Sequence, residues 1–500
     1  MSTGPVGEVA PSGTVTEDGL EWRRMHPVTP VIRSWKAFAG IIAIGAWRFT
    51  DDFSTTRDFV ADGGWRFVLA GVGVVVLVAA VYSALAWRVT RFAVGEEAVH
   101  LNSGIVFRQQ RQARLDRLQS VDVVRPLLAR LAGLSQLTLE VAGAVDSKVE
   151  LAFLKDEEAV ALRAELLAKA AGVRRAAPAG LTAEGGPTAD AVAIVPEPVE
   201  EAPERTVIEV PVRRLIGSIA LSGVAVAAVL VILGLLGTLV LTFTGRVDLT
   251  DVVSGNLVVL VPAVLGVASV AWSRFSGGYG FRAAISPDGI RLSRGLLETR
   301  AQTIAPGRIQ AIELTQPLLW RKAGWWRVRM NVAGYGMATE EASTTLLPVG
   351  DVDETLLACW LVLPDLGTED AVGALTAAMT GSGEAAGFTL ISRRVRFLSP
   401  LVYRRNGFLV TERALVLRHG RLRRVVQIVP HERTQSLGLD QGVLARALKV
   451  AHFTLHSVAG PVRPAIQDLD LDVAHRLMQD QAARARQARA LDRPERWMER

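Results

Sequence analysis

The stretch "RLQSVDVVRPLLARLAGLSQLTLEVAG", from Arg117 to Gly143, returns twice more along the 500-residue chain. The second copy, "RIQAIELTQPLLWRKAGWWRVRMNVAG", runs from Arg308 to Gly334, and the third, "RTQSLGLDQGVLARALKVAHFTLHSVAG", runs from Arg433 to Gly460. A glycine stands 13 positions before the first arginine of each copy, at Gly104, Gly295 and Gly420. Spacings that match over three segments indicate an internal repeat.

An arginine and a glutamine open every copy of the repeat, two positions apart: Arg117 and Gln119, Arg308 and Gln310, Arg433 and Gln435. These side chains could form a shared ligand contact, or they could bond to loop carbonyls at the start of a strand and fix the bend. Their recurrence in segments whose surface charge has otherwise diverged favours the structural interpretation.

Each copy has the pattern of β structure. Segments such as "AVHLNSG", "ALVLRHG" and "LTLEVAG" alternate apolar and polar residues and end at a turn. A helix is expected to close each unit, over residues 155–172, 350–363 and about 470–490. Asp156, Asp351 and Asp470 stand where an N-terminal carboxylate is favoured. This pattern predicts three α+β domains, each a small antiparallel barrel or sandwich with a C-terminal helix.

Long charge-free runs lie outside the repeats. They cover residues 215–245, Phe67–Trp87 and Val252–Ser273. The first run would make a helix of about 46 Å, longer than the bilayer core of about 30 Å. These runs and a shorter one over residues 35–47, for which an interfacial helix is the alternative, predict four membrane spans in two hairpins.

The charges beside these runs predict their orientation. Arginine and lysine dominate the outer ends of both hairpins, whereas the turns within the hairpins mix arginine with aspartate. By the positive-inside rule, we expect a multi-pass protein of the inner membrane with its termini and domains in the cytoplasm. The single cysteine, Cys359, allows no intrachain disulfide, which agrees with a reducing compartment. The start "MSTGPVGEVAP" lacks the pattern of a cleavable signal.

The expected order of segments alternates hairpins with domains. Residues 1–33 form an N-terminal cytoplasmic tail, 34–87 the first hairpin, 88–175 the first domain, 176–206 a flexible linker, 213–273 the second hairpin, 279–366 the second domain, 367–390 a second linker and 393–490 the third domain. The third domain has no hairpin of its own.

This pattern resembles the bacterial pleckstrin-homology-like (PH-like) membrane-flanked domain family, in particular its larger membrane members with several such domains. The likeness is carried by the register of arginine, glutamine, "PLL", arginine and "AG", by the paired apolar runs, and by "RRVRFLSPLVYRRNGF" before the third copy. The resemblance implies bent antiparallel barrels capped by a helix at the cytoplasmic membrane face, with no established catalytic activity. The third copy departs from it, because "QGV" replaces "PLL" and one residue is inserted.

No residue pattern is typical of catalysis or of a cofactor site. A glycine-rich phosphate loop, a nucleophile elbow and paired acidic motifs are missing, so we expect a non-enzymatic protein without cofactors. His452 and His456 lie on an expected strand, roughly 13 Å apart, too far for one metal ion. The basic pI near 9.8 would suit nucleic acid, but the apolar runs and the lack of a reading helix argue against that partner.

Arginines gather around the third domain: Arg393, Arg394, Arg396, Arg404, Arg405, Arg418, Arg421, Arg423 and Arg424. Phe397, Tyr403 and Phe408 flank them and could enter a membrane interface. A basic face gains about 1 kcal/mol per Lys or Arg near anionic lipids. This set is therefore a candidate lipid- or partner-binding surface, with a solvated arginine-rich face as the alternative.

Three tryptophans mark the second domain, Trp320, Trp325 and Trp326. The other copies carry Ala129 and Ala445 opposite Trp320, so the shared fold does not require it. The tryptophans are candidates for a wedge resting on the membrane or for a protein contact. Core packing of one of them is the alternative.

We expect a membrane-anchored scaffold that presents PH-like domains at the inner leaflet. Its partners would be membrane lipids and a membrane protein, such as a smaller relative of the same family. A role in envelope stress or antimicrobial tolerance is implied by the resemblance alone. The alternative is a transport- or channel-associated subunit with a four-helix bundle, which the lack of ionisable residues inside the spans disfavours.

Overall fold

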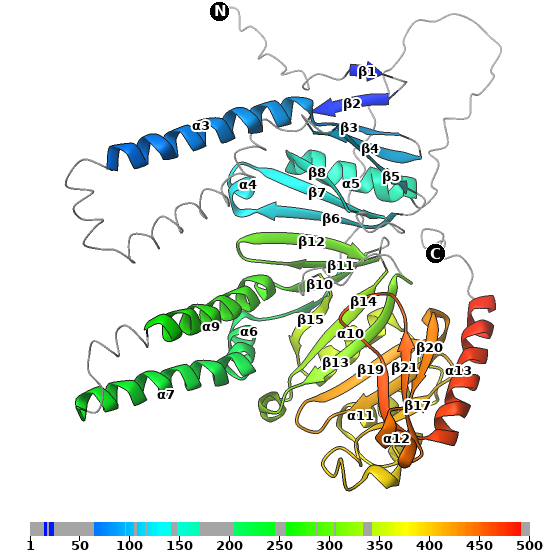
Figure 1. The fold of residues 1–500 in the computed structure, drawn as a ribbon. Helices are drawn as coiled ribbons and strands as arrows, with labels where there is room; N and C mark the ends of the chain where they lie inside the picture. The colour runs from blue at the N-terminus through cyan, green and yellow to red at the C-terminus, as the bar shows by residue number, and fades with distance from the viewer. Residues whose placement is uncertain are drawn as a thin grey trace, which may run out of the picture. The chain divides into compact units, whose positions relative to one another are not determined.

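The computed structural model describes residues 15–17, 20–24, 65–170 and 205–491, apart from short stretches at 96, 105–107, 116–117, 142–147, 246–256, 287–288, 305–306 and 334–342. The chain divides into two compact units, residues 1–201 and 202–500. Antiparallel β-sheet is the main architecture of both units (Figure 1).

The first unit contains the first repeat as two sheets. One sheet has the strand order β1 (Val15–Glu17), β2 (Leu20–Arg24), β3 (Arg91–Val94), β4 (Ala98–Ser103) and β5 (Gln109–Arg114). The other consists of β6 (Leu118–Pro126), β7 (Leu134–Val141) and β8 (Lys148–Lys155). The helices are α3 (Trp65–Val89), α4 (Leu127–Leu131) and α5 (Asp156–Ala170). Arg125 Nε donates to Asp156 at 3.0 Å, which ties the first turn of α5 to β6.

The second repeat follows the same plan in the second unit. Its first sheet consists of β9 (Arg205–Glu209), β10 (Arg282–Ser286), β11 (Gly289–Arg294) and β12 (Glu298–Ile304). Its second sheet consists of β13 (Ile309–Gln316), β14 (Trp326–Val332) and β15 (Thr345–Gly350). The helices are α6 (Val212–Ala220), α7 (Gly223–Phe243), α9 (Leu257–Gly278), η3 (Leu319–Ala323) and α10 (Val352–Val362). Asp351 and Glu354 form a capping box at the start of α10.

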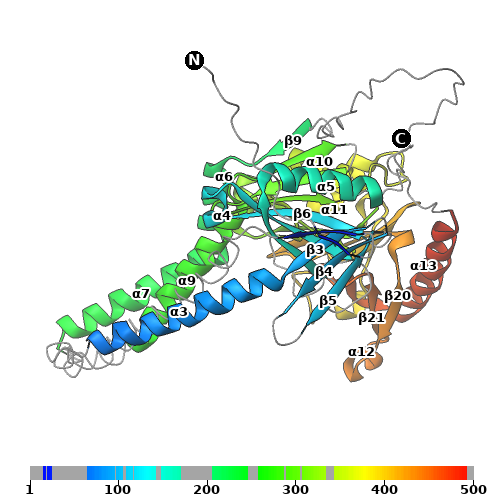
Figure 2. The same ribbon diagram turned by 90° about the horizontal axis from the view of Figure 1, so that it is seen from above.

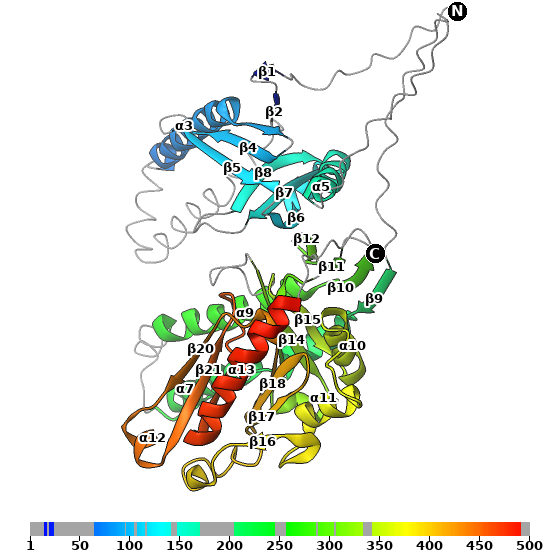
Figure 3. The ribbon, with the colours of Figure 1, turned by 90° about the vertical axis from the view of Figure 1, so that its right-hand side faces the viewer.

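The third repeat completes the second unit. Its strands are β16 (Thr389–Leu390), β17 (Gly407–Val410), β18 (Ala414–His419) and β19 (Arg424–Pro430), then β20 (Ser436–Asp440), β21 (Val450–His456) and β22 (Ala465–Asp470). The helices are α11 (Ala371–Thr380), η4 (Ala385–Gly387), η5 (Arg393–Val395), η6 (His431–Arg433), α12 (Val443–Ala447) and α13 (Leu471–Leu491). The closing helix α13 runs beside β20 and β21 (Figure 3).

The second and third repeats share one sheet. β13 pairs antiparallel with β19, with Leu314 opposite Val426. Seven strands therefore run in the order β15-β14-β13-β19-β18-β17-β16. The apolar core of the second repeat also includes the buried side chains of Ala414, Val416 and Ile428 from the third. These two repeats form one body.

The glycine that precedes each repeated arginine lies at a turn between strands. Gly295 follows β11 with φ of 113°, Gly420 follows β18 with φ of 77°, and Gly104 follows β4 with φ of 101°. A Cβ at Gly295 or Gly420 would collide with the carbonyl oxygen three residues later. Because only glycine adopts this conformation at little cost, the repeated spacing marks a hairpin.

One topological feature recurs in all three repeats. In each, the first sheet includes a strand that comes earlier in the chain, separated from the strand beside it by helices or, in the third repeat, by the segment 391–406. β2 pairs with β3, β9 with β10, and β16 with β17. In the second repeat, α7 and α9 extend side by side away from the sheets (Figure 2). Residues 391–406 of the third repeat occupy the topological position that α6, α7 and α9 occupy in the second.

The predicted fold class with four membrane spans is wrong. Among the described residues, one helix, α7, is long and apolar enough to cross a membrane. The first expected span, residues 35–47, lies outside the described residues. A charge-free run shows only that a segment lacks charged residues, whereas a membrane span requires a continuous helix with an uninterrupted apolar surface. α9, for example, has Pro262 in its interior, and its last turns hold Arg274 and line a polar cavity.

The structure also differs from the expected linkers and tail. The segment 367–390 contains α11, whose Leu375, Ala378 and Met379 are buried in the core of the second repeat. Within the expected N-terminal tail, β1 and β2 extend the first sheet. The linker expected at 176–206 lies outside the described residues except for its last two positions.

Candidate functional site

The nine arginines predicted as one surface of the third repeat differ in burial: two are buried, one is half-buried and six are exposed. Arg405 and Arg418 are buried, with exposed fractions of 6% and 0%. Arg424 is half-buried, and its Nη1 donates to Gln316 at 3.1 Å across the seam between β13 and β19. The exposed members are Arg393, Arg394, Arg396, Arg404, Arg421 and Arg423.

Arg405 and Arg418 hold the C-terminal end of α11. Arg405 donates to the carbonyl oxygen of Ala378 at 2.8 Å, and Arg418 donates to that of Ala377 at 3.0 Å. The Arg418 guanidinium also lies 3.9 Å from the ring centroid of Phe388. The last carbonyls of a helix lack partners within it and favour a positive charge. Desolvation by burial lowers the pKa of Arg405 to about 9 and that of Arg418 to about 10. Both residues support the fold from inside.

The third-repeat loop, residues 393–404, combines exposed arginines with exposed apolar side chains. The apolar members are Phe397, Leu398 and Leu401, with exposed fractions of 69%, 49% and 59%. Two of the aromatic residues expected to join them do not, because Tyr403 is half-buried and Phe408 is buried. The loop therefore presents a mixed basic and apolar surface.

The three tryptophans pack inside the second repeat. Trp320 and Trp326 are buried, and the Trp320 ring N–H donates to the carbonyl oxygen of Ser218 in α6 at 3.0 Å. Trp325 is half-buried, with its ring 6.4 Å from that of Trp320 and in contact with Gly217 of α6. Trp320 and Trp325 thus join this part of the second repeat to α6, and core packing, the alternative considered for one tryptophan, describes both Trp320 and Trp326.

The repeated glutamine has a structural contact in the second copy. Gln310 Nε2 donates to the carbonyl oxygens of Gly307 and Arg308 at 3.3 and 3.4 Å, in the loop before β13. This is the bond to loop carbonyls that the structural interpretation expects.

The other signature residues differ in their surroundings. Arg433 lies 3.8 Å from Glu432, and Gln435 is exposed. Arg117 is outside the described residues, and Gln119 is described only as a backbone position of β6.

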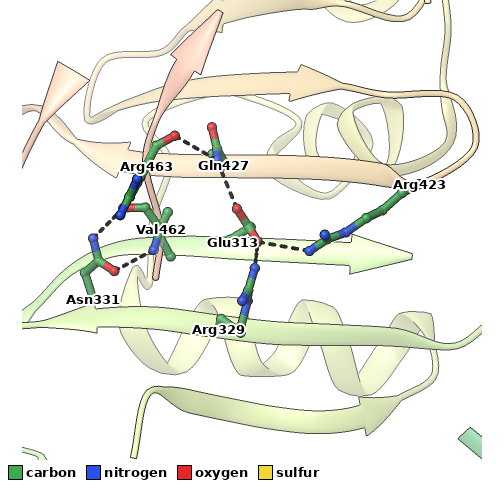
Figure 4. Close-up of polar contacts among 7 residues, drawn as sticks. All are labelled: Glu313, Arg329, Asn331, Arg423, Gln427, Val462 and Arg463. Carbon is green, nitrogen blue, oxygen red and sulfur yellow. Dashed lines mark hydrogen bonds and ion pairs between the residues drawn. The ribbon is translucent and has the colours of Figure 1, made fainter. Parts of the chain in front are cut away.

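A buried polar network crosses the seam between β13 and β19 (Figure 4). Glu313, 6% exposed, forms an ion pair with Arg329 of β14. From the third repeat, Gln427 Nε2 donates to Glu313 at 3.0 Å and Arg423 lies 3.8 Å away. A buried carboxylate is costly unless it is paired. The partners of Glu313 come from both repeats. Their bonds to this carboxylate therefore favour one arrangement of the second repeat against the third.

A second contact, through Asn331, reaches the loop after β21 (Figure 4). Asn331 Nδ2 donates to the carbonyl oxygen of Val462 at 2.7 Å, and the Val462 amide donates back to Asn331 Oδ1 at 2.8 Å. Asn331 is fully buried, so these two bonds satisfy a side chain that water does not reach.

A cavity of about 560 Å³ lies in the second repeat where α6 and α9 meet the sheets. Its charged lining consists of Arg274, Arg294, Arg300, Arg327 and Glu298. Four guanidinium groups and one carboxylate give this lining a net charge of +3. Glu298 pairs with Arg300 at 2.8 Å, and buried Arg294 donates to the carbonyl oxygen of Thr345 at 2.9 Å.

An apolar groove of about 520 Å³ adjoins this cavity between α6, α7 and α9. Ile219 and Trp272 line both hollows, so the groove continues the cavity along the helices. Alanines open the space between α7 and α9: Ala225, Ala228, Ala268 and Ala271. This pair of hollows was not predicted from the sequence, although alanines facing each other on two apolar helices are a usable signal.

Histidine and cysteine give no sign of a metal centre. Within the described residues, no three His, Cys, Asp or Glu side chains gather as a metal site requires. Cys359 is buried, and desolvation raises the pKa of its thiol to about 12. The reactive thiolate is therefore scarce at neutral pH.

The chain belongs to the bacterial PH domain family. The model of that family matches three segments, residues 38–170, 212–361 and 361–485, which together cover more than half of the chain. The resemblance seen in the repeats is thereby confirmed. No curated protein and no solved structure gives a significant match.

Proposed function

We propose that the chain is a non-enzymatic, membrane-associated binding protein whose PH-like domains form a platform for lipids or a membrane protein at the cytoplasmic face of the inner membrane. Membership in the bacterial PH domain family supports a binding or scaffolding role. The non-enzymatic part of the proposal rests on the sequence, which carries no catalytic motif.

The observation that carries this proposal is the uncovered surface of α7. The helix has 21 residues, and an 18-residue stretch of it has a mean hydropathy of 2.9. None of its side chains is buried within the described chain. A helix of this length spans about 31 Å, close to the bilayer core of about 30 Å. Because a protein in water rarely exposes such a large apolar surface, we infer that lipid covers α7.

The third-repeat loop supports a second contact with the membrane. Its arginines would face anionic headgroups, while Phe397, Leu398 and Leu401 would enter the interface. The loop stands at the topological position of the helices in the second repeat. This common position favours a shared role in attachment.

The partner and the physiological role are parts of the same proposal. A smaller relative of the family is the partner that the resemblance suggests, and a pull-down of the full chain in mild detergent would identify it. Susceptibility of a deletion strain to membrane-active peptides tests the role in envelope stress. A transport- or channel-associated subunit is disfavoured, because it requires a four-helix bundle and only α7 among the described residues is long and apolar enough to cross a membrane.

Membrane attachment through α7 can be tested by paired lysine substitutions. Leu233→Lys with Leu236→Lys places two charges near the middle of α7, where each costs about 2.5–3.5 kcal/mol. The control, Val443→Lys with Leu444→Lys, alters exposed apolar residues of α12. In salt-washed membranes, we expect wild type and control to be retained and the α7 variant to be lost. Release of the wild type by salt, or equal retention of both variants, contradicts the proposal.

A further inference from the structure

The cavity at the base of α6 and α9 has the chemistry of an anion site. Its lining has a net charge of +3. Arg294 is 4% exposed and is held by bonds to Thr345 and to the Gln302 side chain at 3.0 Å. Guanidinium groups fixed in this way match the geometry of phosphate oxygens.

The adjoining groove has the opposite chemistry. It is lined by apolar side chains of α6, α7 and α9, and Ile219 and Trp272 form its boundary with the cavity. Its volume of about 520 Å³ is in the range of pockets that hold drug-sized molecules. A single ligand that fills both hollows must carry an anionic head and an apolar tail.

The position of the two hollows matches a membrane interface. The groove lies along the first turns of α7, after the N-cap residue Ser222, and the cavity lies beyond it at the sheets. If α7 crosses the bilayer core, the cavity is at the depth of the headgroups. Trp272, which is 51% exposed, stands at the boundary where tryptophan collects in membrane proteins.

We propose that the cavity and the groove are one binding site for an anionic membrane phospholipid, with the phosphate in the cavity and an acyl chain in the groove. The proposal rests on the membrane association proposed above and names a ligand for it. A free phosphate would use the cavity alone, whereas a zwitterionic lipid would lack the net negative charge that the arginines select.

The test uses the full chain reconstituted in phosphatidylcholine nanodiscs with added phosphatidylglycerol. Native mass spectrometry then measures the phosphatidylglycerol that stays bound after detergent release. Arg274→Ala removes a cavity charge from the half-buried end of α9, and we expect retention to fall about tenfold, the effect of losing one charge-assisted bond. Arg446→Ala, at an exposed arginine of α12 outside the candidate lipid-binding surface, is the matched control and should leave retention unchanged.

A second variant examines the tail. Ala228→Phe fills the groove without touching the cavity charges, so it should lower lipid retention and leave the binding of inorganic phosphate unchanged. Equal retention of phosphatidylcholine and phosphatidylglycerol, equal losses in the two arginine variants, or inorganic phosphate that binds as tightly as the lipid would each overturn the proposal. If the chain stays in salt-washed membranes while any of these results is found, this inference fails and the proposed membrane attachment stands.

Discussion

Single residues hold the second and third repeats together. Gly460, the glycine that ends the third copy of the repeated stretch, lies directly against the side chain of Asn331. Asn331 in turn exchanges two hydrogen bonds with Val462. The glycine is needed here for close approach rather than for a turn.

Gly460→Ala is therefore expected to destabilise the second unit. The new Cβ would overlap the Asn331 amide, which is fully buried and held by its two bonds to Val462, so we expect a loss of about 1–3 kcal/mol. The measurement is the urea concentration at which Cys359, the single cysteine, becomes reactive to a thiol reagent. Gly442→Ala is the control, because no atom lies within 4 Å of its Cβ and its φ is −72°. Equal midpoints for the two variants would show that the Asn331 contact is unimportant.

Some glycine positions could be explained from the sequence and others could not. The spacing of Gly295 and Gly420 identified turns, because a hairpin needs glycine for the conformation of its own short turn. The need for glycine at position 460 could not be read from the sequence, although the residue recurs in each copy. It comes from the close approach of Asn331, which is 129 positions away in the chain. Long-range contacts of this kind leave no local pattern.

At the scale of elements, α11 depends on two buried arginines. Arg405 bonds to the carbonyl oxygens of Ala378 and Met379 near the end of the helix, and Arg418 bonds to that of Ala377, which also accepts from the Gly381 amide. The sequence placed Arg418 and Arg421 in one surface, since both belong to one arginine-rich hairpin. The structure separates them, because α11, from a segment that looked like a linker, covers β18.

Arg418→Met should loosen α11 from the sheet. It removes charged hydrogen bonds to the carbonyl oxygens of Arg405 and Ala377, each worth about 1.5–3 kcal/mol. We expect a clear fall in the urea midpoint for Cys359 labelling, since Cys359 and α11 share one core. Arg421→Met changes an exposed side chain and should shift the midpoint little. A midpoint of Arg418→Met equal to that of Arg421→Met would contradict the role assigned to Arg418.

The role of Trp320 also depends on a neighbouring element. Ala129 and Ala445 in the other repeats correctly showed that the shared fold does not need a tryptophan at the position of Trp320. What fixes Trp320 is α6, which accepts its ring N–H at Ser218. A residue that differs between copies can therefore serve a local packing partner instead of a ligand.

At the scale of the whole molecule, the repeats predicted the domain family and the β-rich domains, and the apolar runs overstated the membrane spans. The pairing of β13 with β19 could not be predicted from the sequence, because strand partners from different repeats share no local pattern. That pairing turns two repeats into one body, from which α7 and α9 extend. This joined body is the central structural claim, since it places α7 of the second repeat and the loop 393–404 of the third repeat in one unit.

Hydrogen exchange on the full chain in detergent micelles tests this claim most directly. A strand with partners on both sides protects all its amides, whereas an edge strand leaves every second amide open to water. β20 has one partner strand among the described residues and serves as the internal control. We predict that consecutive amides of β19 exchange as slowly as those of β18, and that alternate amides of β20 exchange faster. Alternating fast exchange in β19 would show that the seam is open and would contradict the joined body.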